Sequence, residues 1–420
     1  MLKAAQSTEQ AIYFSGLEAP VLLKNAGALV PVLKQALPSW SFAQTRDAPP
    51  SSPCMTVTGH GDGTFLCQTR DPETNKARRW DAVNAVCEMI VALAWEQIQS
   101  NPEWLCLHCA AIEFNGRLVL FPNRRRSGKS TLTAVLAQRG FTVFSDDFVP
   151  IKIGDDGLMY GVANGVNPRL RLPVAETFTA EFKSWVADSM AASNDQYAYL
   201  GIDTLAPRGT YLPIGAVVVL DRQDTACDTA LHAVHPMEIL DDLITQNFGR
   251  MAHSGRILAA SNGVAQTARG HRLRYHAAED AAVYLEDQFR DWSTPVARVV
   301  DAVLGQEPTA DLQITETEPA LFDPCATYTR AAGVSEVSME DQLYVADGHG
   351  VGIQKMNAGS NLIWRILEDP MSLGDISDLL SAAFPNHPPA EITSDSAKTL
   401  QQLLHNHLIV PVPPSEGQLG

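Results

Sequence analysis

Basic residues are scarce in this chain, which has 31 Lys and Arg against 48 Asp and Glu and a formal net charge of −17. A protein that binds nucleic acid or an anionic membrane surface usually carries a basic patch, and no compensating basic stripe runs along the sequence. Long apolar runs are also missing, since no stretch approaches the roughly 20 residues of a membrane-spanning helix. The first residues lack the apolar core of a signal peptide. We therefore expect neither a nucleic-acid partner nor a membrane.

Cysteine is sparse, with seven residues scattered widely, so we expect no disulfide framework and take a reducing cytoplasm as the simplest location. The segment Cys106-Leu107-His108-Cys109 contains residue types that bind metal ions. No second ligand pair follows at zinc-like spacing, so buried free thiols are the favoured interpretation.

The 420 residues suffice for two or three domains with sizeable cores. We predict four regions from shifts in composition and pattern. They are an N-terminal α/β subdomain (1–100), a phosphate-loop domain (101–305), a polar, acidic, proline-bearing linker (306–335) and a small C-terminal domain (336–412). The stretch from Ala180 to Arg208 has no clear period and stays unassigned.

The most informative motif lies in the second region, where an apolar strand (Arg117–Pro122) precedes Gly128-Lys129-Ser130-Thr131 and an amphipathic helix that Gly140 ends. Upstream, Trp104 to Phe114 is expected to form one strand. Downstream, a strand from Phe141 to Ser145 is expected beside the loop strand and leads into Asp146-Asp147. This order places a phosphate cradle and two acids at one edge of a sheet, as phosphoryl transfer requires.

The loop departs from the usual G-x-x-x-x-G-K-[ST] pattern, because Asn123 replaces the first glycine. We predict that Lys129 neutralises phosphate and that the Ser130 hydroxyl binds Mg²⁺. The three arginines could clamp phosphate or form a solvated basic turn. The predicted nucleotide-binding stretch is Asn123, Arg124, Arg125, Arg126, Ser127, Gly128, Lys129, Ser130 and Thr131.

Asp146 and Asp147 could divide two tasks, with one acid holding Mg²⁺ and the other accepting a proton from an attacking hydroxyl. Adjacent acids at the end of a strand can also be solvated or cap a turn. Two further alternatives stay open for the loop: a chance match, and a degenerate site that binds nucleotide without turnover.

From His108 through Lys129 to Asp146-Asp147, the chain resembles the HPr serine kinase/phosphorylase superfamily, and especially the HPr-kinase-related enzymes encoded with peptide-modification genes. The resemblance implies a kinase core of the type shared with phosphoenolpyruvate carboxykinase, with ATP and Mg²⁺ as cofactors. It implies a catalytic set of His108, Lys129, Asp146 and Asp147. We favour Asp146 as the base, and Ser130 with Asp147 as metal ligands.

Two further segments, Asn167–Arg171 and Pro207–Gly209, are candidates to bring cations to this site. The superfamily often assembles, so the resemblance leaves a homo-oligomer open.

The C-terminal region shows a hairpin (Gln342–Asp347 with Gly352–Met356) and three helices, one opened by a capping box of Ser372 and Asp375. This winged-helix-like pattern resembles the PqqD family, chiefly over Asn357–Leu367 and Ser372–Ile376. The resemblance implies that a leader peptide adds a strand to the Gly352–Met356 edge, with the helix near Ser394–His405 as the other wall. A module for dimerisation or intramolecular packing is the alternative.

Together these features predict an ATP-dependent peptide serine kinase, a phosphotransferase that modifies a hydroxyl of a ribosomally made precursor peptide held by its C-terminal domain. One alternative is a scaffold with a decayed nucleotide loop that presents peptide to another enzyme. The other is a different phosphate chemistry on the same core, such as phosphorolysis.

Overall fold

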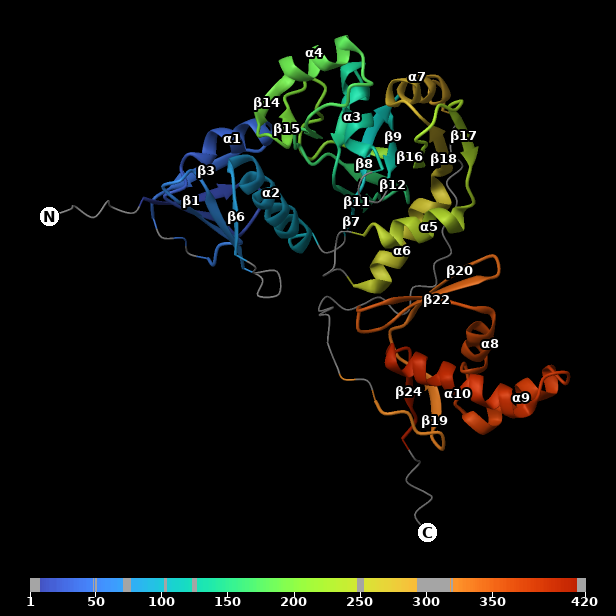
Figure 1. Ribbon diagram of the computed structural model, residues 1–420. Coiled ribbons are helices and arrows are strands. Elements are labelled where there is room, and N and C mark those ends of the chain that lie inside the picture. The colour runs from blue at the N-terminus through green and yellow to red at the C-terminus, as the bar shows by residue number, and fades with distance from the viewer. Residues whose placement is uncertain are drawn as a thin grey trace. The chain divides into compact units, whose positions relative to one another are not determined.

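The structure is a computed structural model that describes residues 8–47, 49, 51–70, 77–101, 104–122, 127–247, 253–292, 318 and 320–413. The chain forms two compact units (Figure 1): Met1–Arg250 with Val264–Arg298, and Met251–Gly263 with Val299–Gly420. The first unit contains both regions that the sequence separates near residue 100. Within the described residues, no helix combines the length and the apolar character needed to cross a membrane.

The first unit begins with a sheet in the order β3-β1-β2-β4-β5-β6, in which β2 and β4 run parallel. Its strands are β1 (Glu9–Phe14), β2 (Val21–Lys24), β3 (Phe42–Thr45), β4 (Met55–Gly59), β5 (Phe65–Thr69) and β6 (Arg78–Trp80). Two helices, α1 (Leu29–Ala36) and α2 (Ala82–Gln99), share its apolar core. The Asp81 carboxylate caps α2 by accepting from the amides of Val83 and Asn84, which fixes where this helix starts.

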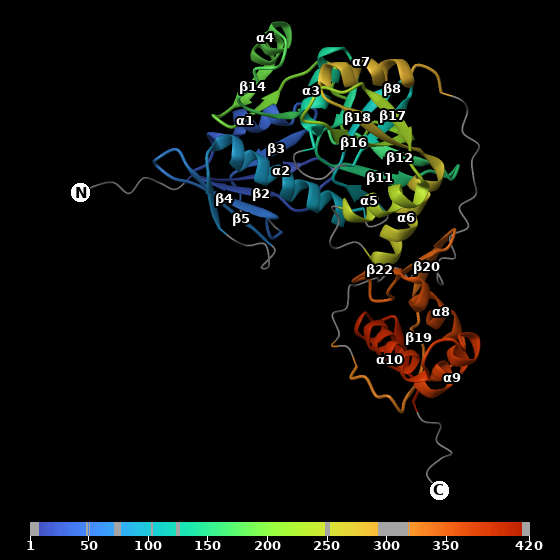
Figure 2. The same cartoon turned by 45° about the vertical axis from the view of Figure 1, so that its right-hand side comes forward.

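A larger sheet follows, with the strand order β10-β8-β9-β16-β12-β11-β7, and with β18 and β17 continuing from β16. Its strands are β7 (Leu105–Leu107), β8 (Ala110–Phe114), β9 (Arg117–Phe121), β10 (Val143–Ser145), β11 (Val149–Ile153), β12 (Met159–Val162), β16 (Tyr211–Arg222), β17 (Ala230–Ala233) and β18 (Arg269–Tyr275). The helices are α3 (Lys129–Gln138), α5 (Pro236–Thr245) and α7 (Ala278–Gln288). A further helix, α6 (Ser254–Thr267), belongs to the second unit up to Gly263. Figure 2 shows α3 and α7 on one face of this sheet and α5 on the other.

Parallel pairing of β9, β16 and β18 at the centre of this sheet explains the uninterrupted apolar run of β16, since such strands are covered on both faces. Gly140 ends the α3 segment as the sequence predicts, with φ of +92° and amides that return to the last turn of the helix.

Two expectations about this sheet are wrong. The single strand expected from Trp104 to Phe114 is broken at His108 and Cys109, and its halves, β7 and β8, lie at distant positions in the sheet. The strand β10 does not pair with the loop strand β9, because β8 lies between them. Two successive antiparallel pairings nevertheless leave β9 and β10 pointing the same way, so both release the chain at the same sheet edge.

The stretch without sequence period, Ala180 to Arg208, begins with α4 (Ala180–Ser189), β14 (Met190–Ser193) and β15 (Tyr197–Leu200). These strands form a small sheet with β13 (Arg169–Arg171) in the order β13-β15-β14.

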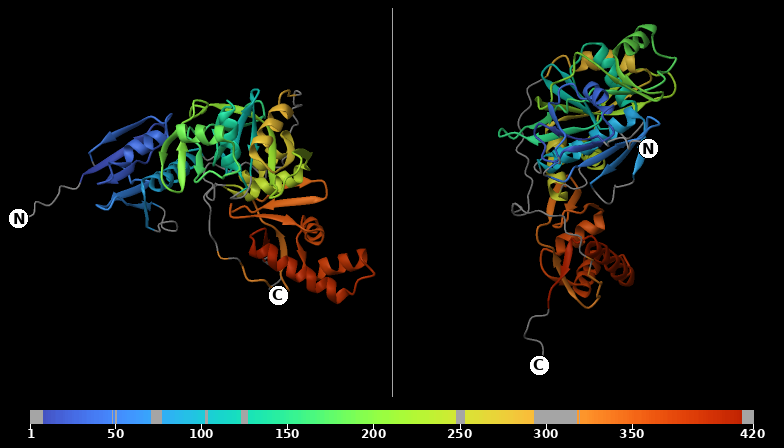
Figure 3. Two further views of the ribbon diagram at one scale, coloured as in Figure 1. Left: turned by 45° about the horizontal axis from the view of Figure 1, so that its top comes forward. Right: turned by 90° about the vertical axis from the view of Figure 1, so that its left-hand side faces the viewer.

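In its described residues, the second unit combines two three-stranded sheets with three helices and the first part of α6. One sheet has the order β23-β19-β24 and the other β20-β21-β22. The elements are β19 (Thr327–Arg330), β20 (Ser335–Met339), β21 (Gln342–Ala346), β22 (Ile353–Met356), α8 (Ala358–Ile366), β23 (Met371–Ser372), α9 (Leu373–Ala383), α10 (Pro389–His405) and β24 (Ile409–Pro411). The helices α9 and α10, in red, lie side by side in both views of Figure 3.

The core of this unit surrounds Trp364, which is fully buried. The predicted capping box of Ser372 and Asp375 is confirmed at the start of α9. The predicted linker needs a correction at its C-terminal end, because β19 lies inside it and pairs with β23 and β24. Residues 306–317 of the predicted linker fall outside the described residues.

Candidate functional site

The phosphate-loop half of the site lies where β9 ends and α3 begins. Gly128 precedes the helix with φ of +97°, a conformation that glycine adopts without strain. A Cβ added to Gly128 would lie 2.7 Å from the Tyr275 hydroxyl, which donates a hydrogen bond to the Ser127 carbonyl at 3.3 Å. The Lys129 side chain is buried at the first helical position, and Ser130 and Thr131 follow it in the first turn. This arrangement is of a kind that suits an anion, because a helix N-terminus presents amides and the Lys129 side chain lies beside it.

Four members of the predicted nucleotide-binding stretch, Asn123 and Arg124 to Arg126, lie outside the described residues. Their role as phosphate ligands stays a prediction. Within the described part of the loop, the Ser127 hydroxyl oxygen is buried and has no hydrogen-bond partner. A buried polar atom of this kind suits a loop whose natural partner is a ligand.

Asp146 is buried directly behind the start of α3. Its carboxyl hydrogen-bonds to the Ser130 hydroxyl, and its Oδ2 accepts from the Arg169 amide at 2.9 Å. Burial, together with the neighbouring charge of Asp147, raises the pKa of Asp146 to about 7. The group is therefore half protonated near neutral pH, and any bound cation would favour its ionised form.

Asp147 lies at the mouth of the same site, with 55% of its side-chain surface exposed. The surrounding protein partly desolvates this carboxyl and favours its neutral form. Its hydrogen bond with His108 and the positive charges of His108, Lys129 and Arg169 outweigh that effect and hold the pKa of Asp147 below its ordinary value. The His108 Nδ1 lies 3.2 Å from Asp147 Oδ1. The two adjacent acids thus have opposite pKa shifts, which suits two different tasks.

The strand break corrected above is what brings His108 to this carboxylate. His108 lies between β7 and β8, and its amide donates to the Gln246 carbonyl at 2.7 Å instead of joining a strand ladder. In an unbroken strand, His108 would share a face with Cys106, as the sequence suggests. The bend instead places the imidazole where β10 delivers Asp147.

The loop between β12 and β13 ties the two acids to the N-terminal sheet. Asn164 Nδ2 donates to Ser145 Oγ at 2.9 Å, immediately before the acids, and the Asn164 carbonyl accepts from Trp40 Nε1 at 2.7 Å. Asn167 Nδ2 donates to the Gln35 carbonyl at 2.8 Å. The β12–β13 loop is therefore bonded to the α1 region on one side and to the candidate site on the other.

Of the two segments expected to bring cations to the site, one reaches it and the other does not. Arg169 reaches the site through its amide, and its guanidinium bonds to Asn84 Oδ1 at 2.6 Å and Cys87 Sγ at 3.0 Å on α2. Arg208 instead stacks on Trp40 at 3.6 Å and donates to the Ser15 carbonyl, so Pro207–Gly209 packs against the N-terminal sheet.

Sequence inspection missed three contributors: Tyr275, Asn164 and Asn84. Tyr275 ends β18, which runs parallel to β16, so its position at the carboxyl end of a parallel strand is the one signal that could have pointed to any of the three.

The residues present fit a magnesium nucleotide. Mg²⁺ is commonly held by one or two carboxylates, a hydroxyl and substrate phosphates, not by a full protein cage. Ser130 and Asp146 offer a hydroxyl and a carboxyl in contact, beside Lys129 and the helix N-terminus. In the described residues, this site included, no group of three or more His, Cys, Asp and Glu side chains could hold a metal ion.

A second candidate surface lies in the second unit, on the sheet β20-β21-β22. The β20 edge is approached by α6, since a Cβ added at Gly255 would lie 2.7 Å from Ser335 Oγ. The strand β22, which the sequence predicts as the peptide edge, pairs with β21 on one side. A tight turn precedes β22, where the buried Asp347 carboxylate accepts from the amides of His349, Val351 and Gly352.

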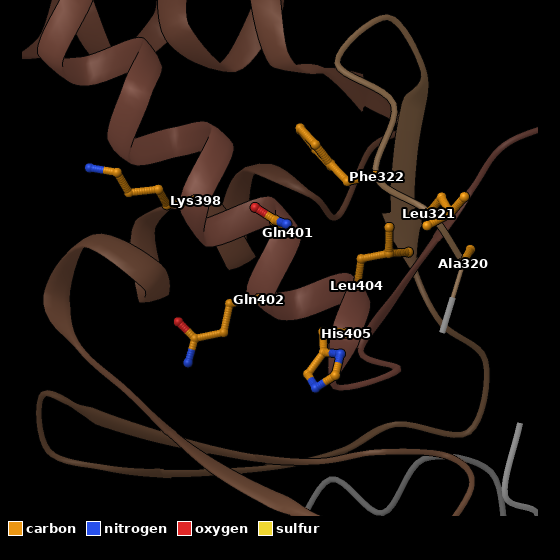
Figure 4. A pocket seen from close by; sticks show the side chains of 8 residues that line it. All are labelled: Ala320, Leu321, Phe322, Lys398, Gln401, Gln402, Leu404 and His405. Atoms are coloured by element: carbon orange, nitrogen blue, oxygen red, sulfur yellow. The ribbon is translucent and has the colours of Figure 1, made fainter. Parts of the chain in front are cut away.

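The predicted helical wall forms part of α10 and lines a pocket of about 420 Å³. Figure 4 shows this pocket between α10 and the extended segment that precedes β19. Residues 320–322 form the other side of this pocket. Because no residue of β22 lines it, the pocket is distinct from the predicted peptide edge. It is lined by Ala320, Leu321, Phe322, Lys398, Gln401, Gln402, Leu404 and His405.

Comparison with known proteins supports the resemblance of the C-terminal region. Residues 344–409 match the family model described as coenzyme PQQ synthesis protein D (PqqD). The solved structure of the Hpr(Ser) kinase/phosphatase from Coxiella burnetii covers 44% of this chain and 93% of its own, at 10% identity and a TM-score of 0.24. No match was found among curated proteins. At this TM-score the kinase structure is a neighbour only, so the kinase proposal depends on the site residues themselves.

Proposed function

We propose that this protein is an ATP-dependent kinase that phosphorylates a hydroxyl, with serine as the expected acceptor, on a precursor peptide bound by its PqqD-like region. One observation carries the proposal. The first turn of α3 meets two adjacent acids of opposite pKa shift, one bonded to Ser130 and the other to His108.

The contacts favour an assignment of the acids opposite to the one first preferred from the sequence. Asp146 is buried against Ser130, the hydroxyl expected to bind Mg²⁺, so Asp146 suits the metal side. Asp147 is half exposed, ionised over a wide pH range and oriented by His108, so Asp147 suits the role of base. Lys129 and the amides that follow Gly128 would hold the nucleotide phosphates.

In the proposed reaction, the Asp147 carboxylate accepts the proton of the acceptor hydroxyl as its oxygen bonds to the γ-phosphorus of ATP. The bond from that phosphorus to the β–γ bridging oxygen breaks, and ADP leaves with the bond's electron pair. Bound Mg²⁺ would neutralise charge on the phosphates. Lys129 would supply a fixed positive charge in a buried setting, where electrostatic stabilisation is strong.

The match over residues 344–409 supports a peptide-binding role for the second unit. An extended peptide that pairs with β22 would gain main-chain hydrogen bonds from an exposed strand edge. Binding a leader at one module raises the effective concentration of the rest of the peptide at the other, so the kinase site needs little affinity of its own.

The test has two arms. Calorimetry with ADP and Mg²⁺ should show binding that Lys129→Ala abolishes. Mass spectrometry of a serine-peptide library incubated with the full chain and ATP should show a gain of one phosphate. Each of the single variants Lys129→Ala and Asp147→Asn should fail to add this phosphate. Arg274→Ala, an exposed change on β18, is the matched control and should keep both signals. Peptide binding without nucleotide binding would replace the kinase with a presenting scaffold.

A further inference from the structure

Within the described residues, the strand β13 is an edge strand, and its outer edge lies beside Asp146 of the candidate site. On its inner edge it pairs with β15, in a register that places Arg169 opposite Tyr199 and Arg171 opposite Tyr197. The Leu172 amide donates to the Gln196 carbonyl. Because antiparallel ladders alternate, the peptide groups of Arg169 and Arg171 point away from β15. The Arg169 amide confirms this direction, since it donates to Asp146.

Two arginines, Arg169 and Arg171, lie on this strand. Arg169 and Arg171 are two positions apart and share a face, on which both guanidinium groups lie over the Tyr197 ring, at 3.8 and 5.7 Å. The Arg169 guanidinium bonds to the neutral groups of Asn84 and Cys87, and Arg171 Nη2 donates to the Tyr197 hydroxyl at 3.2 Å.

Across the described residues, neither of these guanidinium groups forms an ion pair with a carboxylate, although the chain carries a net charge of −17. Arg171 is exposed at the far end of the strand.

We propose that the acceptor segment of the peptide binds in an extended conformation along the outer edge of β13, where it pairs with the outward peptide group of Arg171 and passes the Asp146 carboxyl that holds the Arg169 amide. The acceptor hydroxyl lies opposite Arg169, next to the two acids. Arg171 then selects a carboxylate side chain two residues from the acceptor. This inference rests on the proposed kinase activity and adds the sequence class of its substrate.

The spacing supports this assignment. Residues two apart in a strand are separated by roughly 7 Å and point to the same face, so a partner strand repeats that period. A peptide with its hydroxyl at the Asp146 end therefore presents its second neighbour at Arg171. The strand direction decides whether this neighbour precedes or follows the acceptor.

A positional-scanning library tests the proposal, with a fixed serine and all residues varied around it, using the full chain and ATP. Wild-type protein should favour Asp and Glu over Lys and Arg by about two- to fivefold at one of the two positions two residues from serine, the size of an exposed ion pair. Arg171→Glu should reverse that preference towards Lys and Arg. Arg274→Glu, an exposed charge reversal on β18, should leave it unchanged.

Phosphorylation without a charge preference at either position, or an unchanged preference in Arg171→Glu, overturns this inference and leaves the kinase proposal standing. Absence of phosphorylation by the wild-type chain, with ADP binding intact, rejects both. The peptide library together with the ADP-binding measurement therefore distinguishes a failure of this inference from a failure of the kinase proposal.

Discussion

The Nδ1 of His108 and the Oδ1 of Asp147 lie 3.2 Å apart, although the two residues are 39 positions apart in the sequence. Their contact depends on a break between β7 and β8 and on the placement of β10 beside β8. It keeps the more exposed of the two acids ionised and oriented, which is the property a general base needs.

Replacing this base should reduce turnover far more than binding. We expect Asp147→Asn to lower kcat by about 10²- to 10⁴-fold, the usual contribution of a general base, while ADP affinity stays near wild type. His108→Gln should give a smaller loss, because it removes orientation but keeps the carboxylate. Single-turnover measurements of phosphate transfer give the rate loss of each variant. Full activity in Asp147→Asn would assign the proton transfer to another group.

Asp146 should make the metal-free protein less stable as pH rises. Its folded-state pKa, about 7, lies above the ordinary value of 3.8. Its contribution to stability is therefore fully present below pH 3.8 and is lost as pH rises through about 7. Asp146→Asn should raise the free energy of unfolding at pH 8 by at most about 4 kcal/mol, and change it little at pH 4. Urea unfolding without Mg²⁺ at the two pH values checks this.

The same carboxyl should make cation binding depend on pH. Because a metal ligand must be ionised, and a carboxyl with a pKa of about 7 is about fivefold less ionised at pH 6 than at pH 7, Mg²⁺ affinity in the presence of ADP should fall about fivefold over that interval. Asp146→Asn should bind Mg²⁺–ADP weakly and with little pH dependence. Calorimetry at the two pH values measures it, and an equal pH dependence in the variant would remove Asp146 from the metal site.

Gly128 should tolerate no side chain, for two separable reasons. Its φ of +97° strains any L-residue, and a Cβ would lie 2.7 Å from the Tyr275 hydroxyl. We expect Gly128→Ala to cost about 2 kcal/mol of stability and to abolish ADP binding. Gly140→Ala is a matched control, because φ is +92° there and nothing lies within 4 Å of the added Cβ.

The control Gly140→Ala should lose stability from backbone strain alone and keep ADP binding. Adding Tyr275→Phe to Gly128→Ala should recover only the steric part of the loss. If Gly140→Ala weakens ADP binding as much as Gly128→Ala does, the effect is not local to the loop.

Peptide binding to β22 can be tested with proline. The Asp347 amide donates to the Gly352 carbonyl, so the alternating ladder leaves the Ile353 amide on the outer edge and the Gln354 amide bonded to β21. Ile353→Pro should keep the sheet and weaken a peptide selected for binding to the wild-type chain by roughly three- to tenfold, the value of one hydrogen bond.

Two control variants separate edge pairing from general damage. Ile353→Ala should bind peptide nearly as wild type, and Gln354→Pro should destabilise the sheet itself. Equal peptide affinity for Ile353→Pro and Ile353→Ala, measured by fluorescence anisotropy, would place the peptide elsewhere.

Local patterns explain what could be predicted. The Gly128-Lys129-Ser130 turn, the Gly140 stop and the Ser372–Asp375 capping box each depend on residues close together in sequence, and each lies where expected. The long strand expected from Trp104 to Phe114 failed, because an apolar run shows β-character without showing a bend. The linker was drawn too long for a similar reason, since the strand in Thr327–Arg330 gains its partners from residues 371–372 and 409–411.

The sequence by itself determined that a glycine, a lysine and two acids would follow strands released at one sheet edge. Tertiary structure alone decided which acid meets Ser130 and which meets His108, and it brought Arg169 and the α1 region to the same place. The reason is physical. Helix starts and turns are stabilised by neighbouring amides, whereas the environment of a carboxyl is set by partners that only the packed chain brings within hydrogen-bond distance.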